Sequence, residues 1–342
     1  MFLPEKHTQG STLILRQISH LQRFLRWIND KVDGALNEPS LPAHKIVEYA
    51  DSFRAEEITR LSAELNPRSS EARLTCHLYD NLDAIFAGET TGIQVALQDN
   101  RLIDMYATGQ TCHEGNRRLA SVIDLLAHKN PSMKILEIGA GTGSATKEIL
   151  PTLQGDSPWR RYFEYKFTDI TASFLAGAEE TFQAYSGITY SVFDMEKPGS
   201  DQYLSAEWDL IIASNVVHAT SDIRKTLVNI RSLLKPGGKM ILLEITNPSL
   251  GFGLMLGTFS DFWKGDLDPH LPRVDGPSLS KAMWREVIPT AGFNGVDFFL
   301  DDYVGDNVSS TVICASAVQP AIAIPQPLDH PPQGITLVCP HK

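Results

Sequence analysis

A glycine-rich turn near the middle of the chain is the first feature that could bind a small molecule. Residues 135 to 150 read ILEIGAGTGSATKEIL, with glycine at Gly139, Gly141 and Gly143 and an acidic residue, Glu137, two positions earlier. Glycine permits positive φ and lets a ligand lie against bare backbone, while the following helix offers its N-terminal amides. A tight turn that binds nothing is the alternative, and the residues around the turn decide between the two.

The spacing of this turn separates two classes of nucleotide-binding protein. It is G-x-G-x-G, whereas dinucleotide-binding turns have G-x-G-x-x-G. Ser144 stands where the third glycine of that pattern would fall, although small substitutes are tolerated there. A nicotinamide-dependent dehydrogenase is therefore disfavoured.

Two aspartates stand at the ends of the next two predicted strands. Asp169 ends the second strand, where a carboxylate can accept both ribose hydroxyls, and Asp194 ends the third, where it can accept an adenine amino group. Each alone could be an ordinary turn aspartate. Ligands of parallel sheets bind outside the carboxyl ends of the strands, so together the two predict an adenosine-containing cofactor.

Short apolar runs that alternate with helical segments predict the elements that position these residues. The strand-like runs are KILEI, EYKFTD, ITYSVF, WDLIIAS and KMILLEI, and the helices between them include TASFLAGAEETFQAY and DIRKTLVNIRSLL. Parallel neighbours need a crossover connection, so this order predicts a doubly wound α/β sheet with helices on both faces. LLKPGGKMILLE predicts a helix end, a turn and the fifth strand. Two last runs, VDFFLDDYV and STVICASAV, are joined by a short GDN turn, so they should pair antiparallel and complete a seven-stranded, mostly parallel, Rossmann-like sheet whose last strand is antiparallel.

The regions on either side of this core have different patterns. From Ile14 onward, apolar residues recur at steps of three and four, and similar patterns follow over residues 46–61 and 74–86. We therefore predict a helical lid or substrate subdomain over residues 1–115, a core over 116–318 that starts with a helix at 116–128, and a proline-rich linker over 319–342. The last residues, GITLVCPHK, look like the start of another strand and predict a piece of a longer polypeptide, or else a first domain that acts in trans.

Composition narrows the classes of partner. The net charge of -11 over 342 residues argues against a nucleic-acid partner, which needs a dense surplus of Lys and Arg. Four cysteines show neither metal-ligand spacing nor a disulfide framework, so we expect no metal and a reducing cytoplasm. The N-terminus lacks a secretory signal, and no apolar run approaches the ~20 residues needed to span a bilayer.

Five segments together resemble the C-methyltransferase domain of fungal iterative polyketide synthases. They are LLAHKNPSMKILEIGAGTGSATKEIL, FTDITASF, WDLIIASNVVHATSD, LLKPGGKMILLEITNP and MWREVIPTAGFNGVDFF. NVVHAT and LLEIT narrow the match beyond the general class I S-adenosylmethionine-dependent methyltransferases. The resemblance implies S-adenosylmethionine as methyl donor, S-adenosylhomocysteine as product, and a polyketide chain held on the phosphopantetheine arm of an acyl carrier protein as acceptor. The residues predicted to bind the cofactor are Glu137, Gly139, Ala140, Gly141, Gly143, Asp169, Ile170, Asp194, Met195 and Asn215.

Two residues beyond neighbouring strands supply an acid–base pair. His218 lies just past the fourth strand and Glu244 near the end of the fifth, so adjacent strands would bring them together. Methylation of carbon requires an enolate, and a histidine can take the acidic α-proton of a β-ketoacyl thioester near neutral pH. Glu244 would fix the imidazole tautomer and stabilise the imidazolium. The resemblance adds Tyr106 as an active-site tyrosine from the helical region, whose alternative is a core aromatic, and Asn215 could instead have only a turn role.

The long connection after the fifth strand, GFGLMLGTFSDFWKGDLDPHLPRVDG, is rich in glycine and aromatic residues. We predict a lid over the acyl chain with Phe259, Phe262 and Trp263 as its apolar wall, and a surface hydrophobic cluster is the alternative. Two other functions stay open: an O-methyltransferase that acts on a free secondary metabolite, and a non-catalytic methyltransferase-like domain. The intact glycines and the pair of His218 and Glu244 disfavour the non-catalytic one.

Overall fold

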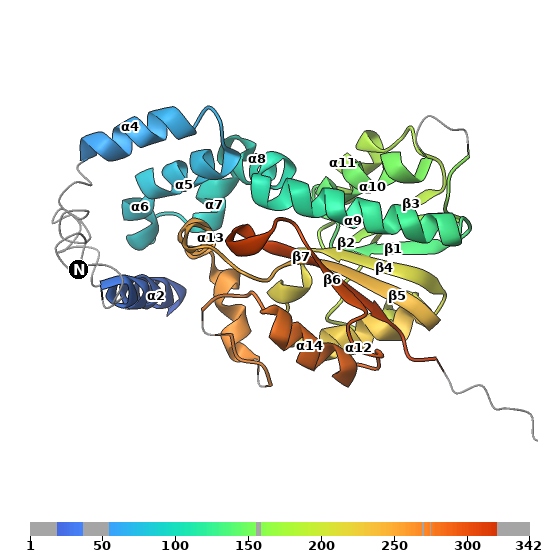
Figure 1. Ribbon diagram of the computed structural model, residues 1–342. Helices are drawn as coiled ribbons and strands as arrows, with labels where there is room; N and C mark the ends of the chain where they lie inside the picture. The colour runs from blue at the N-terminus through green and yellow to red at the C-terminus, as the bar shows by residue number, and fades with distance from the viewer. Residues whose placement is uncertain (1–18, 37–54, 155–158, 269, 274, 320–342) are drawn as a thin grey trace, which may run out of the picture.

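A computed structural model describes residues 19–36, 55–154, 159–268, 270–273 and 275–319. Figure 1 shows a helical region at one end and a sheet covered by helices on both faces at the other. The predicted helix residues Ile14 and 46–54, and all but the first residue of the predicted linker, lie outside the described part. Among the described residues, no helix is both long and apolar enough to cross a membrane.

The helical region is built from short amphipathic helices. They are α2 (Ser19–Leu36), α4 (Ala55–Leu65), α5 (Ser70–Asp80), α6 (Leu82–Phe86), α7 (Gly92–Leu97) and α8 (Arg101–Thr108). Capping residues explain two of the starts: the Ser69 side chain accepts from the amide of Ala72, and Thr91 and Gln94 form a capping box. Two later segments, α13 (Leu250–Leu256) and the 3₁₀ helix η5 (Ser260–Leu267), pack into the apolar core of this region.

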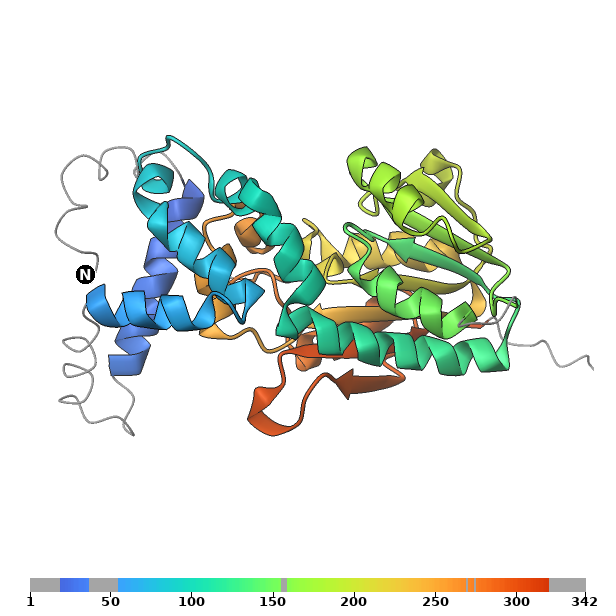
Figure 2. The same cartoon turned by 90° about the horizontal axis from the view of Figure 1, so that it is seen from above.

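Helix α9 (Gln110–Lys129) joins the helical region to the sheet. It begins six residues before the predicted helix at 116, so the predicted border at 115/116 falls inside one continuous helix. Its contacts reach α8 on one side and α10 and the sheet on the other. Figure 2 shows this helix running from the helical region along the sheet.

The sheet has seven strands in the order β3-β2-β1-β4-β5-β7-β6. They are β1 (Lys134–Ile138), β2 (Glu164–Asp169), β3 (Ile188–Val192), β4 (Trp208–Ser214), β5 (Leu234–Ile245), β6 (Phe298–Asp301) and β7 (Ser310–Ser316). The first five pair in parallel, and β7 is antiparallel to both β5 and β6. The predicted seven-stranded α/β fold with an antiparallel last strand is confirmed.

The start of β5 differs from the prediction. The strand begins at Leu234, so the KPGG segment that we predicted as a turn lies within it. Gly237 has φ 75°, and the pairing with β4 shifts register between Trp208 and Leu210. A bulge of this kind inserts extra residues without ending a strand, and a glycine with positive φ makes it possible.

Alternate residues of the strands pack into two apolar layers, one on each face of the sheet. Ile211, Leu242 and their neighbours pack under α12 (Ile223–Leu233) and α14 (Lys281–Thr290). Ile212 and Leu243 face the layer that contains α9 and α10 (Ser144–Gln154), which also receives Ala178 of α11 (Ala172–Thr181). Because successive side chains of a strand point to opposite faces, strands buried on both sides read as continuous apolar runs.

Candidate active site

The glycine turn connects β1 to α10 at the carboxyl edge of the sheet. Gly139, Gly141 and Gly143 all have positive φ, at 63°, 52° and 72°. A Cβ at Gly139 would lie 2.5 Å from a methyl of Val216, and one at Gly143 would lie 2.9 Å from the Phe182 ring. Glycine is therefore required here both by backbone conformation and by close packing.

A cavity of about 190 Å³ opens above this turn. Its lining combines the turn with Glu137 of β1, with Ser214 at the end of β4 and the next residue, Asn215, and with Tyr106 of α8 and Cys112 of α9. Sequence reasoning missed Cys112 and also Phe174, which lines the cavity from α11. Aromatic and thiol residues within helices give no sequence signal that separates a lining role from a core role.

Glu137 is a buried carboxyl group beneath this cavity. Its Oε2 accepts hydrogen bonds from the hydroxyls of Thr146 and Tyr165, each at 2.6 Å. Its Oε1 is buried and has no hydrogen-bond partner among the described residues. Burial raises the pKa of Glu137 to about 7, although the two hydroxyl donors act in the opposite direction.

Asp169 and Ile170, which we also predicted to bind the cofactor, are not in the lining of this cavity. Asp169 ends β2, and its two carboxylate oxygens accept from the amides of Gly141, at 2.9 Å, and Thr171, at 2.8 Å. It therefore supports the glycine turn directly. Ile170, the next residue, is exposed.

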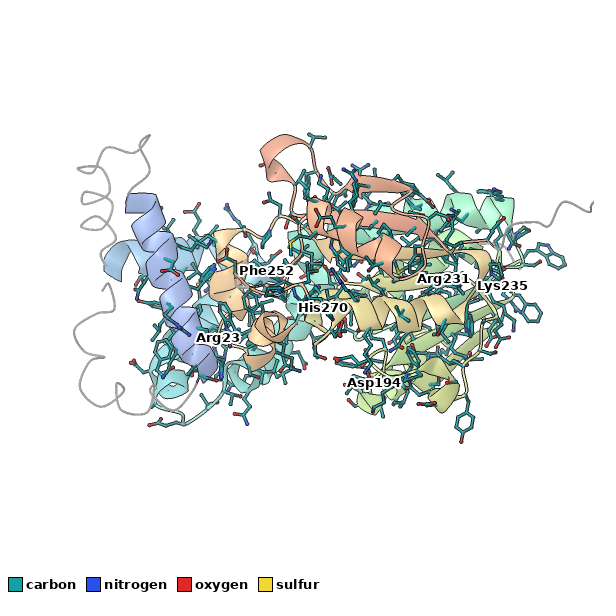
Figure 3. All side chains as sticks on the ribbon, turned by 90° about the horizontal axis from the view of Figure 1, so that it is seen from below. Arg23, Asp194, Arg231, Lys235, Phe252 and His270 are labelled. Carbon is teal, nitrogen blue, oxygen red and sulfur yellow. The ribbon has the colours of Figure 1, made fainter. Side chains whose placement is uncertain are left out.

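Asp194 lies two residues beyond the end of β3 rather than on it. Its carboxylate accepts from the amide of Glu196 at 3.0 Å and pairs with the Lys197 amine at 3.0 Å. Met195 is buried in the apolar layer under α12. Neither Asp194 nor Met195 is in the cavity lining, and Figure 3 shows Asp194 well away from Phe252.

His218 and Glu244 are in contact. The Nδ1 of His218 lies 2.5 Å from Oε2 of Glu244, and the amide of Val217 donates to Oε1 at 3.0 Å. Glu244 is fully buried, and 12% of the His218 side chain is exposed. The contact follows from parallel pairing of β4 with β5, which places Ser214 beside Leu243. Asn215, with φ 53°, then turns the chain and donates its amide to Leu243 O at 2.7 Å.

A second, smaller cavity of about 40 Å³ lies beside His218. It shares Tyr106, Cys112 and Asn215 with the first cavity, so the two adjoin. Since Nδ1 of His218 is engaged by Glu244, Nε2 is the ring nitrogen left to act in this cavity. The Asn215 Oδ1 is buried without a hydrogen-bond partner in the described part of the chain.

Tyr106 and Cys112 are both neutral near pH 7. Burial raises the pKa of Tyr106 to about 12, and the nearby Cys112 adds to the rise. Burial likewise raises the pKa of Cys112 to about 12, helped by the charge of Glu71. Tyr106 lines both cavities and keeps its hydroxyl proton, and its carbonyl accepts from the hydroxyl of Ser144, the first residue of α10, at 2.9 Å.

The predicted lid residues occupy a different place from the one expected. Phe259, Phe262 and Trp263 pack in the apolar core of the helical region, and none of them lines either cavity. Trp263 and Phe262 stack edge to face at 5.0 Å, and the Trp263 indole donates to Gly257 O. The same connection nevertheless supplies the wall, through the α13 residues Phe252, Met255 and Leu256. Figure 3 shows Phe252 where the helical region meets the sheet.

Among the residues that the structure describes, no group of three or more His, Cys, Asp or Glu side chains is arranged to hold a metal ion. The three described cysteines are free thiols.

Comparison with known proteins gives the family. Residues 136–240 match a family described as a methyltransferase domain. The chain is 30% identical to the CurJ carbon methyltransferase, with a TM-score of 0.67, and the match covers 78% of this chain and 71% of that one. This chain belongs to the carbon methyltransferases. It is therefore an S-adenosylmethionine-dependent enzyme, and its fold also matches the trans-methyltransferase CalH in complex with SAH, at 25% identity and a TM-score of 0.77 over 90% of this chain and 88% of CalH.

The curated relatives are much longer proteins. A highly reducing polyketide synthase, rstn3 of Aspergillus nomiae, is 36% identical over 289 residues, which are 83% of this chain and 11% of the synthase. This carbon methyltransferase thus spans about a tenth of the length of the curated relatives that it matches. Together with the carbon methyltransferase CurJ, these relatives show that the chain resembles a carbon-methyltransferase segment of fungal polyketide synthases.

Proposed function

We propose that this domain transfers a methyl group from S-adenosylmethionine to the α-carbon of a β-ketoacyl thioester carried on an acyl carrier protein. The observation that carries the proposal is the pair of His218 and Glu244, of which His218 lines a small cavity that adjoins the cavity over the glycine turn. A base placed between a cofactor site and an acceptor site is the arrangement that C-methylation requires.

The first cavity fits the cofactor. Its orphaned acceptors, Glu137 Oε1 and Asn215 Oδ1, offer places for the cofactor's ammonium or amino groups. Gly139, Ala140 and Gly141 of the turn line this cavity, and Gly143 completes the turn. We assign Asp169 with Ile170, which lie outside the lining, to the ribose, and Asp194 with Met195, which also lie outside it, to the adenine. Bound S-adenosylmethionine supplies a methyl group on a sulfonium, which an adjacent carbanion can attack.

In the proposed mechanism, His218 Nε2 takes the α-proton of the acceptor. Glu244 accepts from Nδ1–H, which leaves the Nε2 lone pair directed away from the carboxylate and stabilises the imidazolium once it forms. The bond to the Val217 amide fixes the carboxylate in turn. Proton transfer by a side chain positioned in this way contributes on the order of 10²- to 10⁴-fold in rate.

Tyr106 is the proposed hydrogen-bond donor to the enolate oxygen. It lines both cavities and keeps its proton, because burial holds its pKa at about 12. A donor that is already oriented where negative charge develops lowers the barrier without reorganisation.

Two observations support the assignment of the acceptor: the apolar wall of the cavity beside His218 and the identity of the curated relatives. Phe252, Met255 and Leu256 make the wall apolar, which suits a hydrocarbon chain. The curated relatives are polyketide synthases, whose growing chains are thioesters. We therefore assign a carrier-bound β-ketoacyl chain rather than a free metabolite.

Mass spectrometry of methyl transfer tests the proposal. The enzyme receives S-adenosylmethionine and an acetoacetyl thioester on a carrier protein or a pantetheine mimic, as wild type, as His218→Ala and as His113→Ala. His113 is an exposed α9 histidine paired with Glu148, outside both cavities, and serves as the matched control. We expect one methyl on the α-carbon with wild type and His113→Ala, and none with His218→Ala.

Two other outcomes would contradict the proposal. If no β-ketoacyl thioester is methylated while the cofactor still binds, the acceptor assignment is wrong and free hydroxylated metabolites become the substrates to test. If His218→Ala methylates as fast as wild type, His218 is not the base.

A further inference from the structure

Arg273 is a buried arginine in the connection between η5 and α14. Only 3% of its surface is exposed. Its Nη1 donates to the carbonyls of His218, at 2.5 Å, and Pro277, at 3.1 Å, and its Nη2 donates to the carbonyl of Thr220 at 3.0 Å. The guanidinium therefore bridges the main chain on either side of Ala219.

Asp268, from the same connection, holds the other end of this segment. Its Oδ2 accepts from the amide of Ile223, the first residue of α12, at 3.2 Å, and its Oδ1 accepts from the amides of His270 and Leu271, each at 3.0 Å. It also lies 3.8 Å from Nη2 of Arg273. The two buried side chains thus hold the segment from His218 to Ile223 at both ends.

Within the segment, the Thr220 hydroxyl donates to Val217 O at 2.8 Å, and Ser221 donates to Glu196. His218 lies in a 3₁₀ turn of three residues, Val217–Ala219, that has no side-chain cap. Such turns have poorer hydrogen-bond geometry than an α-helix. An imidazole that must keep one nitrogen on Glu244 and the other in the acceptor cavity needs a main chain fixed from outside, and Arg273 supplies that contact.

The positive charge of Arg273 also interacts with Glu244, the partner of His218. Burial lowers the pKa of Arg273, while the charges of Asp268 and Glu244 raise it. A cation close to Glu244 offsets part of the negative charge that favours the imidazolium. Tyr106 and Cys112, which line the same cavity as His218, are neutral, and Glu196 accepts from Ser221 of the same segment.

We propose that Arg273 is a positioning residue for the base of this enzyme: it fixes the main chain of His218 and sets the charge balance around the contact of His218 with Glu244. This inference rests on the proposed role of His218. An arginine with a purely structural role would stabilise the fold without affecting the titration of His218. The titration therefore distinguishes a positioning role of Arg273 from a structural one.

Arg231 provides a matched control. It also donates to three main-chain carbonyls, those of Gly292, Leu234 and Val318, but it does so at the end of α12. Figure 3 shows Arg231 far from Phe252 and from His270 of the Arg273 connection. Loss of Arg231 should therefore cost stability in the same way without reaching His218.

The experiment compares wild type, Arg273→Met, Arg273→Lys and Arg231→Met. It measures methyl transfer to an acetoacetyl thioester from pH 5.5 to pH 9, S-adenosylhomocysteine affinity by calorimetry, and His218 titration by NMR of labelled histidine. We expect Arg273→Met to lower kcat by roughly 10- to 100-fold, because small misplacements of a reacting group have effects of that size, with cofactor affinity unchanged. Loss of the guanidinium charge in Arg273→Met should also move the acid limb of the pH profile of kcat, and the His218 titration, to higher pH.

The two remaining variants complete the test. Arg273→Lys keeps the charge, so its acid limb should stay near that of wild type while kcat is intermediate. It also provides a folded variant if Arg273→Met does not fold. Arg231→Met should keep both the profile and kcat.

Each failure has its own signature. If the His218 titration is the same in wild type and in both Arg273 variants, or if Arg273→Met merely behaves as Arg231→Met does, the inference is overturned. If wild type methylates no β-ketoacyl thioester, the proposed function fails, and the NMR titration still decides the role of Arg273.

Discussion

Replacement of Glu244 by glutamine isolates the contribution of one carboxylate to the proposed base. Glutamine has nearly the same shape, so its Oε1 can keep the 3.0 Å bond from the Val217 amide. Its NH₂ group would then face Nδ1 of His218, where Oε2 now accepts at 2.5 Å. An NH₂ donor selects the tautomer with the proton on Nε2, which leaves that nitrogen without the lone pair that abstraction of the α-proton needs.

The size of the effect follows from this geometry. The variant loses general-base catalysis and the stabilisation of the imidazolium but keeps the cofactor site, since Glu244 does not line the first cavity. We expect kcat to fall on the order of 10²- to 10⁴-fold, as for other bases that need a fixed tautomer. S-adenosylhomocysteine affinity should be that of wild type. Stability should fall by about 1.5–3 kcal/mol, the usual contribution of a charged hydrogen bond.

Single-turnover methylation of a carrier-bound acetoacetyl thioester, followed by mass spectrometry, measures the chemical step directly. Glu164→Gln is the control, because Glu164 lies at the start of β2, at the opposite edge of the sheet, where it pairs with Lys134. A β-ketoacyl analogue with a more acidic α-carbon should lose less rate in Glu244→Gln, since it needs a weaker base. A Glu244→Gln enzyme as fast as wild type would refute the tautomer argument.

Three further predictions concern the cofactor turn, the buried carboxyl beneath it and the tyrosine. Gly139→Ala should reduce the free energy of unfolding by roughly 1–2 kcal/mol because of the positive φ alone, and by more because the new Cβ would contact Val216. Gly177→Ala, at an open helical position, is the control and should not destabilise the protein. Urea unfolding of both variants measures the difference. Because burial raises the pKa of Glu137 from 4.5 to about 7, the folded protein keeps a proton that the unfolded chain loses between these values, so this group makes stability fall as pH rises through that window. Glu137→Gln should remove up to roughly 3 kcal/mol of that pH dependence, seen in urea unfolding at pH 5 and pH 8, and parallel pH curves would contradict it. Tyr106→Phe should lower kcat by roughly 10²- to 10³-fold with cofactor affinity unchanged, and an unchanged kcat would remove Tyr106 from the mechanism.

Much of the sheet was predictable because its strands are buried on both faces. KILEI, EYKFTD and WDLIIAS correspond residue for residue to β1, β2 and β4. KILEI and WDLIIAS are largely apolar runs, and EYKFTD alternates the buried Tyr165 and Phe167 with polar residues. The start of β5 was not predictable in this way, because a proline and two glycines usually mark a turn, and here they form a bulge that the pairing with β4 holds in place. The start of α9 was missed for a related reason: polar residues such as Gln110 give no apolar period.

The contact of His218 with Glu244 was also within reach of the sequence, because parallel neighbouring strands bring their carboxyl ends to one edge of the sheet. The sequence alone thus determined the α/β class, the glycine turn and this pair. It could not determine which apolar residues of the connection after β5 face the acceptor cavity. The hydrophobic effect favours burial of any apolar side chain but does not select the place where it is buried, and the apolar residues of both α13 and η5 are buried. Only the tertiary structure decided between them, because it packs Trp27 of α2 against the bare backbone of Gly253 and places Phe252, Met255 and Leu256 of the same helix in the cavity beside His218.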